Sequence, residues 1–344
     1  AGSVCRNLSL PSGGKDVPAR EDVLRKVKSH NTDKDRRGND MQYVRELECY
    51  QEQRKAAVTL GKFDGLHRGH QKLVSRVKEH ASKEVVSVVF AFDMAPLYER
   101  LGKQKKSLMT GKERYEHLDG QTDYLIDCPF TEEISGMEAE TFIKEVLVDQ
   151  FHAAYIAVGT DFHFGHEKRG DIHMLKQYAG IYGYELEVVD KELYQGREIS
   201  STYIKEEVRA GHMEVTRELL GYPYAMSGVV EHGRKLGRKL GIPTMNITPD
   251  IGKLAPPNGV YACRVRIDGN YYQGIGNLGN KPTVDADGKL ILEVNVFSFD
   301  RETYGQTIQV ELLSFVRPER KFASVEELKS QMEADIAAIK RREL

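Results

Sequence analysis

The sequence lacks four features that mark common protein classes. No apolar run approaches the roughly 18–20 residues that a membrane helix needs, and the first residues do not show the charged-then-apolar pattern of a secretory signal. The four cysteines lie far apart without a CxxC pair, which argues against structural zinc and favours free thiols in a reducing cytoplasm. The formal net charge of −2 provides no general basic field for a nucleic-acid polymer. We therefore expect a cytoplasmic protein without a membrane or nucleic-acid partner.

The length and the patterning predict two folded domains behind an N-terminal extension. A chain of 344 residues exceeds one ordinary compact unit. Residues 1–40 carry few large apolar side chains and many charges, so we expect them to be poorly ordered. In residues 41–222, helical patterns alternate with β-branched apolar runs at 56–61, 84–92, 124–130, 153–159 and 184–190. This alternation is typical of a parallel, doubly wound α/β sheet, a Rossmann-like domain.

The remaining residues, 223–344, have a different pattern. Short strands at 225–233, 259–268, 271–279, 290–299 and 307–317 are separated by turn signals such as "DGN". They predict a small antiparallel β-barrel. A helical pattern closes the chain at 324–344, where Ser324 and Glu327 have the spacing of a capping box.

The stretch "TLGKFDGLHRGH", residues 59–70, follows the first predicted strand, and we expect a helix to begin at about its second histidine. Glycines allow close approach of the backbone to a ligand, and a helix N-terminus offers free N–H groups to an anion. A zinc site would need a third ligand or an HExxH pattern, and a P-loop would need GxxxxGK[ST]; neither is present. The pattern favours a polyphosphate site with His67 and His70, although two surface histidines in a glycine-rich turn would look the same.

Three segments of residues 41–222 resemble one family. "GKFDGLHRGH" resembles the HxGH signature of the nucleotidylyltransferase superfamily, in the GxFDGxHxGH form of the FMN adenylyltransferase domain of bacterial bifunctional riboflavin kinase/FAD synthetases. "GTDFHFGHEKRGD" (159–171) is similar to that family's G-x-[DN]-F-x-F-G…R-x-G-D loop, and "ISSTYIKEEVRAG" (199–211) to its S-S-T-x-I-R element. The resemblance extends over residues 41–344 with its motifs in order.

The resemblance implies a set of adenylyltransferase residues. His67 and His70 would be catalytic, stabilising the ATP phosphates during nucleotidyl transfer. The implied ATP and phosphate site consists of Gly61, Phe63, Asp64, His67, His70, Arg169, Ser200, Ser201, Thr202 and Lys205, and the implied flavin site of Asp161, Phe162 and Phe164. Without the family context, "SST" would more often be an ordinary helix N-cap.

The sequence departs from the family pattern at two places. Lys205 stands where the family usually has Arg, which keeps the positive charge but loses the bidentate fork, so transition-state binding would be weaker. The family's F-x-P-H-P is replaced by "FAFDMAPL" (90–97), in which Asp93 and Pro96 are the nearest equivalents, and this affects the FMN side of the site.

In residues 223–344, "GRKLGIPTMNI" resembles the riboflavin kinase G-R-x-L-G-x-P-T-x-N signature. A glycine-rich basic loop can bind phosphates through backbone amides, and Thr and Asn oxygens suit Mg²⁺. A solvated basic hairpin would be the simpler explanation of the loop alone. The resemblance implies that Thr244 and Asn246 bind Mg²⁺ and that Glu293 is the base. The implied ATP site consists of Gly233, Lys235, Gly237, Arg238, Gly241, Pro243, Thr244 and Asn246.

Four further side chains of the barrel have two interpretations each. Arg317 and Arg320 could cover the flavin or close the domain structurally. Phe297 and Tyr304 could pack near the isoalloxazine or fill the core.

The expected function is consecutive flavin chemistry: ATP-dependent phosphorylation of riboflavin to FMN, then adenylylation of FMN to FAD with release of pyrophosphate, both with Mg²⁺ and ATP. Two alternatives remain: a kinase whose adenylyltransferase is impaired, and a non-catalytic protein that senses flavin. Intact HxGH, PTxN and Glu293 favour catalysis, because a sensor need not keep charge-neutralising and base residues together. The oligomeric state does not follow from the sequence.

Overall fold

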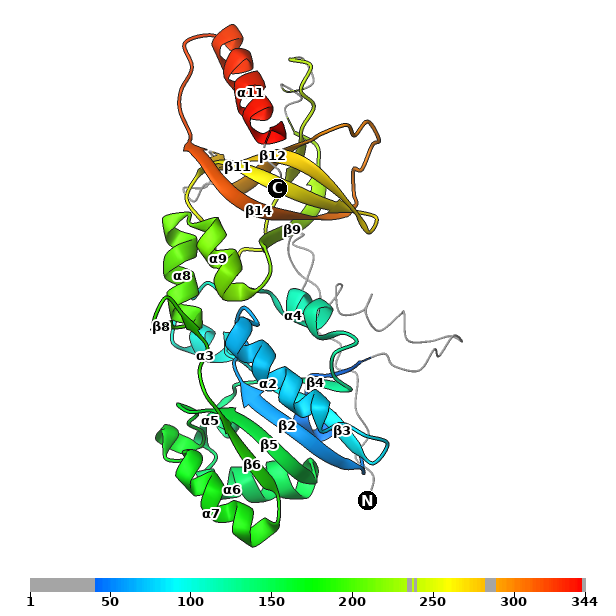
Figure 1. Cartoon of the computed structure of the whole chain (residues 1–344), viewed down its shortest axis with the longest axis vertical. Helices are drawn as coiled ribbons and strands as arrows, with labels where there is room; N and C mark the ends of the chain where they lie inside the picture. Colours follow the sequence, from blue (N-terminus) through cyan, green and yellow to red (C-terminus); the bar gives the residue numbers. More distant parts are fainter. Residues whose placement is uncertain (1–40, 234–236, 238–239, 282–288, 342–344) are drawn as a thin grey trace, which may run out of the picture. The chain divides into compact units, whose positions relative to one another are not determined.

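The computed structural model describes residues 41–233, 237, 240–281 and 289–341 (Figure 1). The expected N-terminal extension, residues 1–40, lies outside the described residues. The two predicted architectures are confirmed: a parallel sheet with helices comes first, and a closed antiparallel barrel with a C-terminal helix follows. Within the described residues, no helix combines the length and the apolar character that a membrane crossing requires.

The first part of the chain forms a six-stranded sheet in which every pairing is parallel. The spatial order is β1-β4-β3-β2-β5-β6. The strands are β1 (Gln42–Val44), β2 (Lys55–Gly61), β3 (Val85–Asp93), β4 (Tyr124–Pro129), β5 (Ala153–Gly159) and β6 (Glu185–Val189). The sequence predicted all of them except β1, which is only three residues long and so has too little pattern to recognise.

Helices cover both faces of this sheet, because alternate side chains of each strand point to opposite faces. Ala57 of β2 packs with Leu73 and Val77 of α2 (Arg68–Glu79), whereas Val58 packs in a cluster with Leu147 on the other face. The other helical elements are η1 (Leu47–Cys49), α3 (Ala95–Arg100), α4 (Gly111–Leu118), α5 (Glu132–Gly136), α6 (Ala139–Thr141) with the π-helix η2 (Phe142–Gln150), η3 (His166–Lys168), α7 (Ile172–Tyr182), α8 (Ser201–Ala210) and α9 (Met213–Leu220). A two-stranded ribbon of β7 (Leu193–Tyr194) and β8 (Arg197–Glu198) precedes α8.

The strand order indicates where a ligand crevice is expected in this sheet. The chain leaves β2 toward β3 on one side, and β5 with β6 lies on the other side of β2. In open parallel sheets the site lies beyond the carboxyl ends of the strands at this reversal. Those ends are Gly61 of β2 and Gly159 of β5, where the first two motifs begin.

The second part is a closed antiparallel barrel in the order β10-β13-β12-β11-β14-β9. Its strands are β9 (Tyr224–Glu231), β10 (Met245–Ile247), β11 (Gly259–Ile267), β12 (Asn270–Lys281), β13 (Lys289–Val296) and β14 (Thr307–Pro318). The sequence did not predict β10, which consists of three residues of the "PTMN" segment. The strand expected at 290–299 ends three residues early, at Val296, because the chain turns there.

The C-terminal helix α11 (Val325–Lys340) packs against the outside of the barrel (Figure 1). Ile336 and Ile339 join a cluster that contains Val260 of β11. The capping box is only half formed: the Ser324 hydroxyl accepts from the Glu327 N–H at 3.1 Å, but the Glu327 carboxylate accepts from the N–H of Ala323, one residue earlier than predicted.

Candidate active sites

The turn after β2 has an unusual backbone. Phe63 and Leu66 have φ values of 46° and 36°, which are uncommon for residues with a Cβ, and Gly65 has a φ of 88°. Phe63 is fully buried and its ring lies against Gly61. Such backbone persists only where the surroundings hold it, and it is concentrated at functional sites.

His67 and His70 lie together where this turn enters α2. The helix begins at Arg68, two residues earlier than predicted, so His67 is its N-cap residue. The two imidazole rings stack with centroids 3.7 Å apart, and the Nδ1 atom of each is buried without a hydrogen-bond partner among the described residues. Burial lowers the pKa of His67 to about 4, against the opposing effect of Asp64. Burial, the His67 imidazole and the Arg114 guanidinium hold the pKa of His70 well below its usual range.

Asp64 connects this turn to the third motif. Its carboxylate forms an ion pair with Lys205 of α8 at 2.6 Å and accepts from the N–H of Leu108 at 2.7 Å. Its backbone carbonyl accepts from the hydroxyl of Ser201 at 2.8 Å. Ser200 caps α8 by accepting from the N–H of Tyr203 at 3.2 Å. The first and third motifs, more than a hundred residues apart, therefore meet at one helix N-terminus, where Thr202 is exposed.

The loop after β5 contributes the predicted flavin residues. Asp161 forms an ion pair with Lys191 at 3.0 Å. The rings of Phe162 and Phe164 stack at 5.6 Å, and Phe164 is buried against Gly170, where a Cβ would collide with the ring. Arg169 is exposed, and its guanidinium contacts the carboxylates of Glu167 at 2.9 Å and Glu138 at 3.8 Å.

The predicted kinase residues meet on the outer face of the barrel. Asn246 of β10 is the direct neighbour of Glu293 of β13 in the strand pairing, so their side chains share one face. The Oδ1 atom of Asn246 is buried without a partner among the described residues. The backbone of Gly233 covers Asn246 so closely that a Cβ at Gly233 would overlap its amide. A Cβ at Gly237 would likewise overlap the carbonyl of Ile242 and lie 3.3 Å from the Thr244 hydroxyl.

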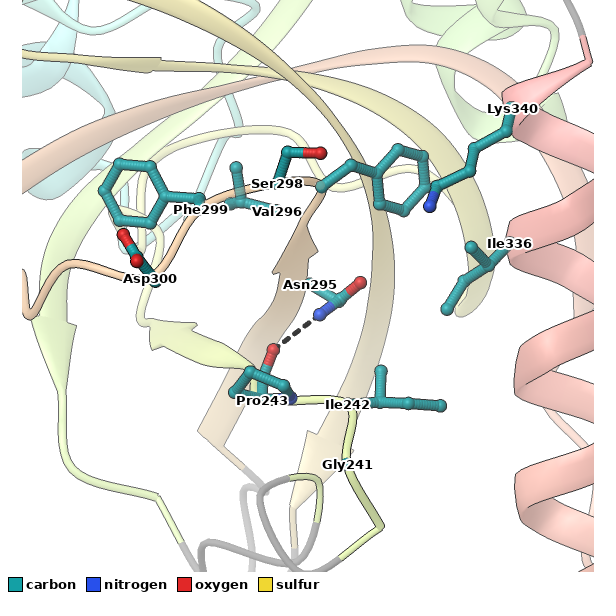
Figure 2. A pocket seen from close by; sticks show the side chains of 11 residues that line it. Gly241, Ile242, Pro243, Asn295, Val296, Ser298, Phe299, Asp300, Ile336 and Lys340 are labelled. Carbon is teal, nitrogen blue, oxygen red and sulfur yellow. Dashed lines mark hydrogen bonds between the residues drawn. The ribbon is translucent and has the colours of Figure 1, made fainter.

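Two of the predicted kinase residues, Lys235 and Arg238, lie outside the described residues. Gly241, which has a φ of 79°, and Pro243 line a cavity of about 570 Å³ between β13 and α11 (Figure 2). Figure 2 shows Asn295 of β13 beside Pro243, whose carbonyl accepts from the Asn295 amide at 2.7 Å. The Lys340 ammonium lies 5.1 Å from the Phe297 ring centroid, and both residues line the cavity.

Arg317 and Arg320 both contact α11. Arg317 forms two contacts with the Asp335 carboxylate, at 2.9 and 2.8 Å, and Arg320 lies 3.8 Å from Glu327. Tyr304 packs on the ring of His232 with centroids 3.8 Å apart. Sequence reasoning did not single out Asn295 or Lys340 as site residues. Asn295 reaches the cavity on β13, and Lys340 reaches it only because α11 packs on the barrel.

Comparisons with known proteins match two parts of the chain to two different family models. The FAD synthetase family model matches residues 49–203, and the riboflavin kinase family model matches residues 220–342. The bifunctional riboflavin kinase/FMN adenylyltransferase of Pseudomonas fluorescens is 35% identical over 309 residues, which cover 87% of this chain and 96% of that protein. The protein of the same description from Buchnera aphidicola is 36% identical over 293 residues, 83% of this chain and 93% of that one.

One solved structure has the same fold over nearly its whole length. It is described as a macrolide-efflux protein from Streptococcus pneumoniae and superimposes with a TM-score of 0.78 at 27% identity, covering 88% of this chain and 99% of that chain.

Proposed function

The chain belongs to the bifunctional riboflavin kinase/FMN adenylyltransferase family and has both activities, and we propose that each resides in one domain. Residues 41–222 form the FMN adenylyltransferase domain and residues 223–344 the riboflavin kinase domain. The first uses ATP to adenylylate FMN, and the second uses ATP to phosphorylate riboflavin.

In the proposed adenylyl transfer, a phosphate oxygen of FMN attacks the α-phosphorus of ATP and pyrophosphate leaves. His67 and His70 donate hydrogen bonds to the α-phosphate, where charge builds up in the transition state. The observation that carries this assignment is the stacked pair of imidazoles at the crevice of the sheet, whose buried Nδ1 atoms have no hydrogen-bond partner among the residues that the structure describes. Their lowered pKa values mean that both rings are neutral N–H donors before ATP binds.

The residues around the histidines complete the proposed phosphate site. Gly61, Phe63 and Asp64 shape the turn, and Ser200, Ser201 and Thr202 place a helix N-terminus beside it. Lys205 supports the site through its ion pair with Asp64. Arg169 must exchange its two carboxylate contacts for phosphate, and Asp161, Phe162 and Phe164 bind the flavin side of FMN.

In the proposed kinase reaction, the ribityl hydroxyl oxygen attacks the γ-phosphorus of ATP, the bond to the bridging oxygen breaks and ADP leaves, while Glu293 takes the hydroxyl proton. The buried, unpartnered oxygen of Asn246 fits a cation ligand, and Thr244 would be the second protein ligand of Mg²⁺. Bound Mg²⁺ supplies charge neutralisation on the phosphates. Gly233, Gly237, Gly241 and Pro243 shape the loop around ATP, and the neighbouring cavity has room for one planar ring system of the substrates, with Phe297 in its wall. The contacts of Arg317 and Arg320 with α11 support a structural role for both.

The proposed partners are riboflavin, FMN, FAD and ATP. We place the reactions in the cytoplasm, where ATP is available, without a nucleic-acid or membrane partner.

Product analysis tests these assignments. Purified protein is incubated with riboflavin, ATP and Mg²⁺, and the flavins are separated by chromatography. His70→Ala should abolish FAD formation while FMN still forms, and Glu293→Ala should abolish FMN formation while supplied FMN still becomes FAD. An intact half-reaction in the corresponding variant would show that the residue assignment is wrong. Wild-type protein that stops at FMN would indicate an impaired adenylyltransferase, and wild-type protein that makes no FMN would indicate a sensor.

A further inference from the structure

Four carbonyl groups of the turn between β2 and α2 each accept a hydrogen bond from a side chain. The Lys62 carbonyl accepts from the Arg114 guanidinium at 3.2 Å, and the Asp64 carbonyl accepts from the Ser201 hydroxyl at 2.8 Å. The Gly65 carbonyl accepts from the Tyr222 hydroxyl, and the Leu66 carbonyl accepts from the Gln71 amide at 2.8 Å. Arg114, Ser201 and Gln71 belong to three different helices, and Tyr222 follows a fourth.

These bonds determine which end of each peptide group can face a ligand. In a trans peptide the carbonyl of one residue and the N–H of the next point in opposite directions. Holding the carbonyls of Lys62, Asp64, Gly65 and Leu66 therefore fixes the N–H groups that follow them. A flipped peptide would turn an oxygen toward the phosphates and repel them. The positive φ values of Phe63 and Leu66 are conformations that persist only where the surroundings hold them, and the four bonds help to hold this turn.

Arg114 is in turn held by the buried carboxylate of Asp127. Its Nη2 lies 3.5 Å from the Asp127 carboxylate of β4, which also accepts from the Tyr43 hydroxyl of β1 at 3.0 Å. Arg114 and Asp127 are both buried, and the Arg114 Nε has no partner among the described residues. A guanidinium is costly to bury without full satisfaction, so its retention next to this turn indicates a specific role.

Tyr222 is attached by its ring as well as by its hydroxyl. The ring contacts the His117 imidazole of α4, with centroids 4.4 Å apart, and packs against the cluster that contains Phe63 and Leu66. Its replacement by Phe would therefore keep the packing and remove only the hydrogen bond to Gly65.

We propose that Arg114 and Tyr222 are positioning residues for adenylyl transfer, which hold the carbonyls of Lys62 and Gly65 so that the turn presents N–H groups to the ATP phosphates. Neither residue lies in a recognised motif of the domain, and neither needs to touch the substrate. The two residues act on the binding of the ATP phosphates and not on the binding of FMN.

Tyr222→Phe gives the sharper test. We expect kcat/KM for ATP in adenylylation to fall about tenfold, as for the loss of one hydrogen bond, with the KM for FMN unchanged. Inhibition by inorganic pyrophosphate should weaken by a similar factor, and riboflavin phosphorylation in the same sample should not change. The control is Tyr184→Phe, which removes a comparable buried bond, from the Tyr184 hydroxyl to the Leu175 carbonyl at 2.6 Å. Wild-type adenylylation in Tyr222→Phe, or an equal loss in the control, would overturn the proposal.

Arg114 is tested by a pair of variants. Arg114→Met should lower adenylylation by roughly 30-fold, because the bond to Lys62 comes from a charged donor. Arg114→Lys keeps a charged donor and should recover part of that loss. Circular dichroism shows whether each variant is folded, and the Tyr222→Phe result stands if Arg114→Met is not. Equal losses in folded Lys and Met variants would exclude the hydrogen bond as the cause.

Discussion

Acidification from pH 7 to pH 5 is expected to destabilise the α/β domain through His67. Burial lowers the pKa of this imidazole from 6.5 to about 4 in the folded protein, whereas the unfolded chain keeps the ordinary value. Between these two values the unfolded chain binds a proton that the folded protein does not. The free energy of unfolding therefore falls as the pH falls through this window, and the loss is complete near the folded pKa.

The size of the effect follows from the two pKa values. At pH 5 the unfolded imidazole is almost fully protonated, while the folded one is protonated in only about a tenth of the molecules. Integrated from pH 7 to pH 5, His67 alone lowers the free energy of unfolding by about 2 kcal/mol. The lowered pKa of His70 acts in the same direction, so His67 is responsible for part of a larger change.

Urea unfolding at both pH values measures this change. Circular dichroism follows the helices, and hydrogen exchange of the α2 amides assigns the transition to the α/β domain. His67→Gln should lose about 2 kcal/mol of the pH dependence seen in the wild type. His173→Gln, at an exposed position of α7, serves as the control and should keep the wild-type dependence. If wild type and His67→Gln lose the same free energy between pH 7 and pH 5, the buried neutral imidazole is refuted.

Three further changes probe individual contacts. Lys205→Arg should raise kcat for adenylylation severalfold, because a guanidinium can hold Asp64 and still offer donors to phosphate; an unchanged or lower kcat would contradict this. Gly233→Ala should lower riboflavin phosphorylation at least tenfold by displacing Asn246, and conversion of supplied FMN to FAD, measured on the same sample, should persist. Asp335→Ala should destabilise the barrel by about 3 kcal/mol in urea unfolding, because it leaves Arg317 unpaired, whereas Glu333→Ala on the exposed side of α11 should have little effect.

The sequence predicts the long strands well, because a run such as "EVVSVVFAF" can only be buried on both faces of a sheet. It fails for β1 and β10, whose three residues each are placed by pairing with β4 and with β9 and β13. The sequence analysis does not predict α4, although Thr110 and Glu113 form a complete capping box there. With eight residues, α4 is too short to show a clear apolar periodicity.

The residues of the candidate sites also divide into those that the sequence predicts and those that only the tertiary structure shows. Residues within a motif, such as His67 and His70, are close in sequence, so their placement at one turn can be predicted from their spacing. Arg114 and Tyr222 are single residues in unremarkable segments, and only the tertiary structure shows that their donors reach the turn. A sequence pattern cannot indicate a hydrogen bond to a backbone carbonyl, because every residue has that acceptor.

The two proposed phosphate sites of the chain differ in which hydrogen-bonding atoms lack a partner. At the α/β site four carbonyls of the turn accept from side chains, and the Nδ1 atoms of the two imidazoles have no hydrogen-bond partner in the described part of the chain, so the site offers donors to an anion. At the barrel site the Oδ1 atom of Asn246, also without a partner among the described residues, neighbours Glu293 in the strand pairing, so that site offers acceptors to a cation or a proton. This contrast matches the two reactions. Adenylyl transfer needs stabilisation of charge on the α-phosphate, whereas phosphorylation of a hydroxyl needs a base and a metal-bound phosphate.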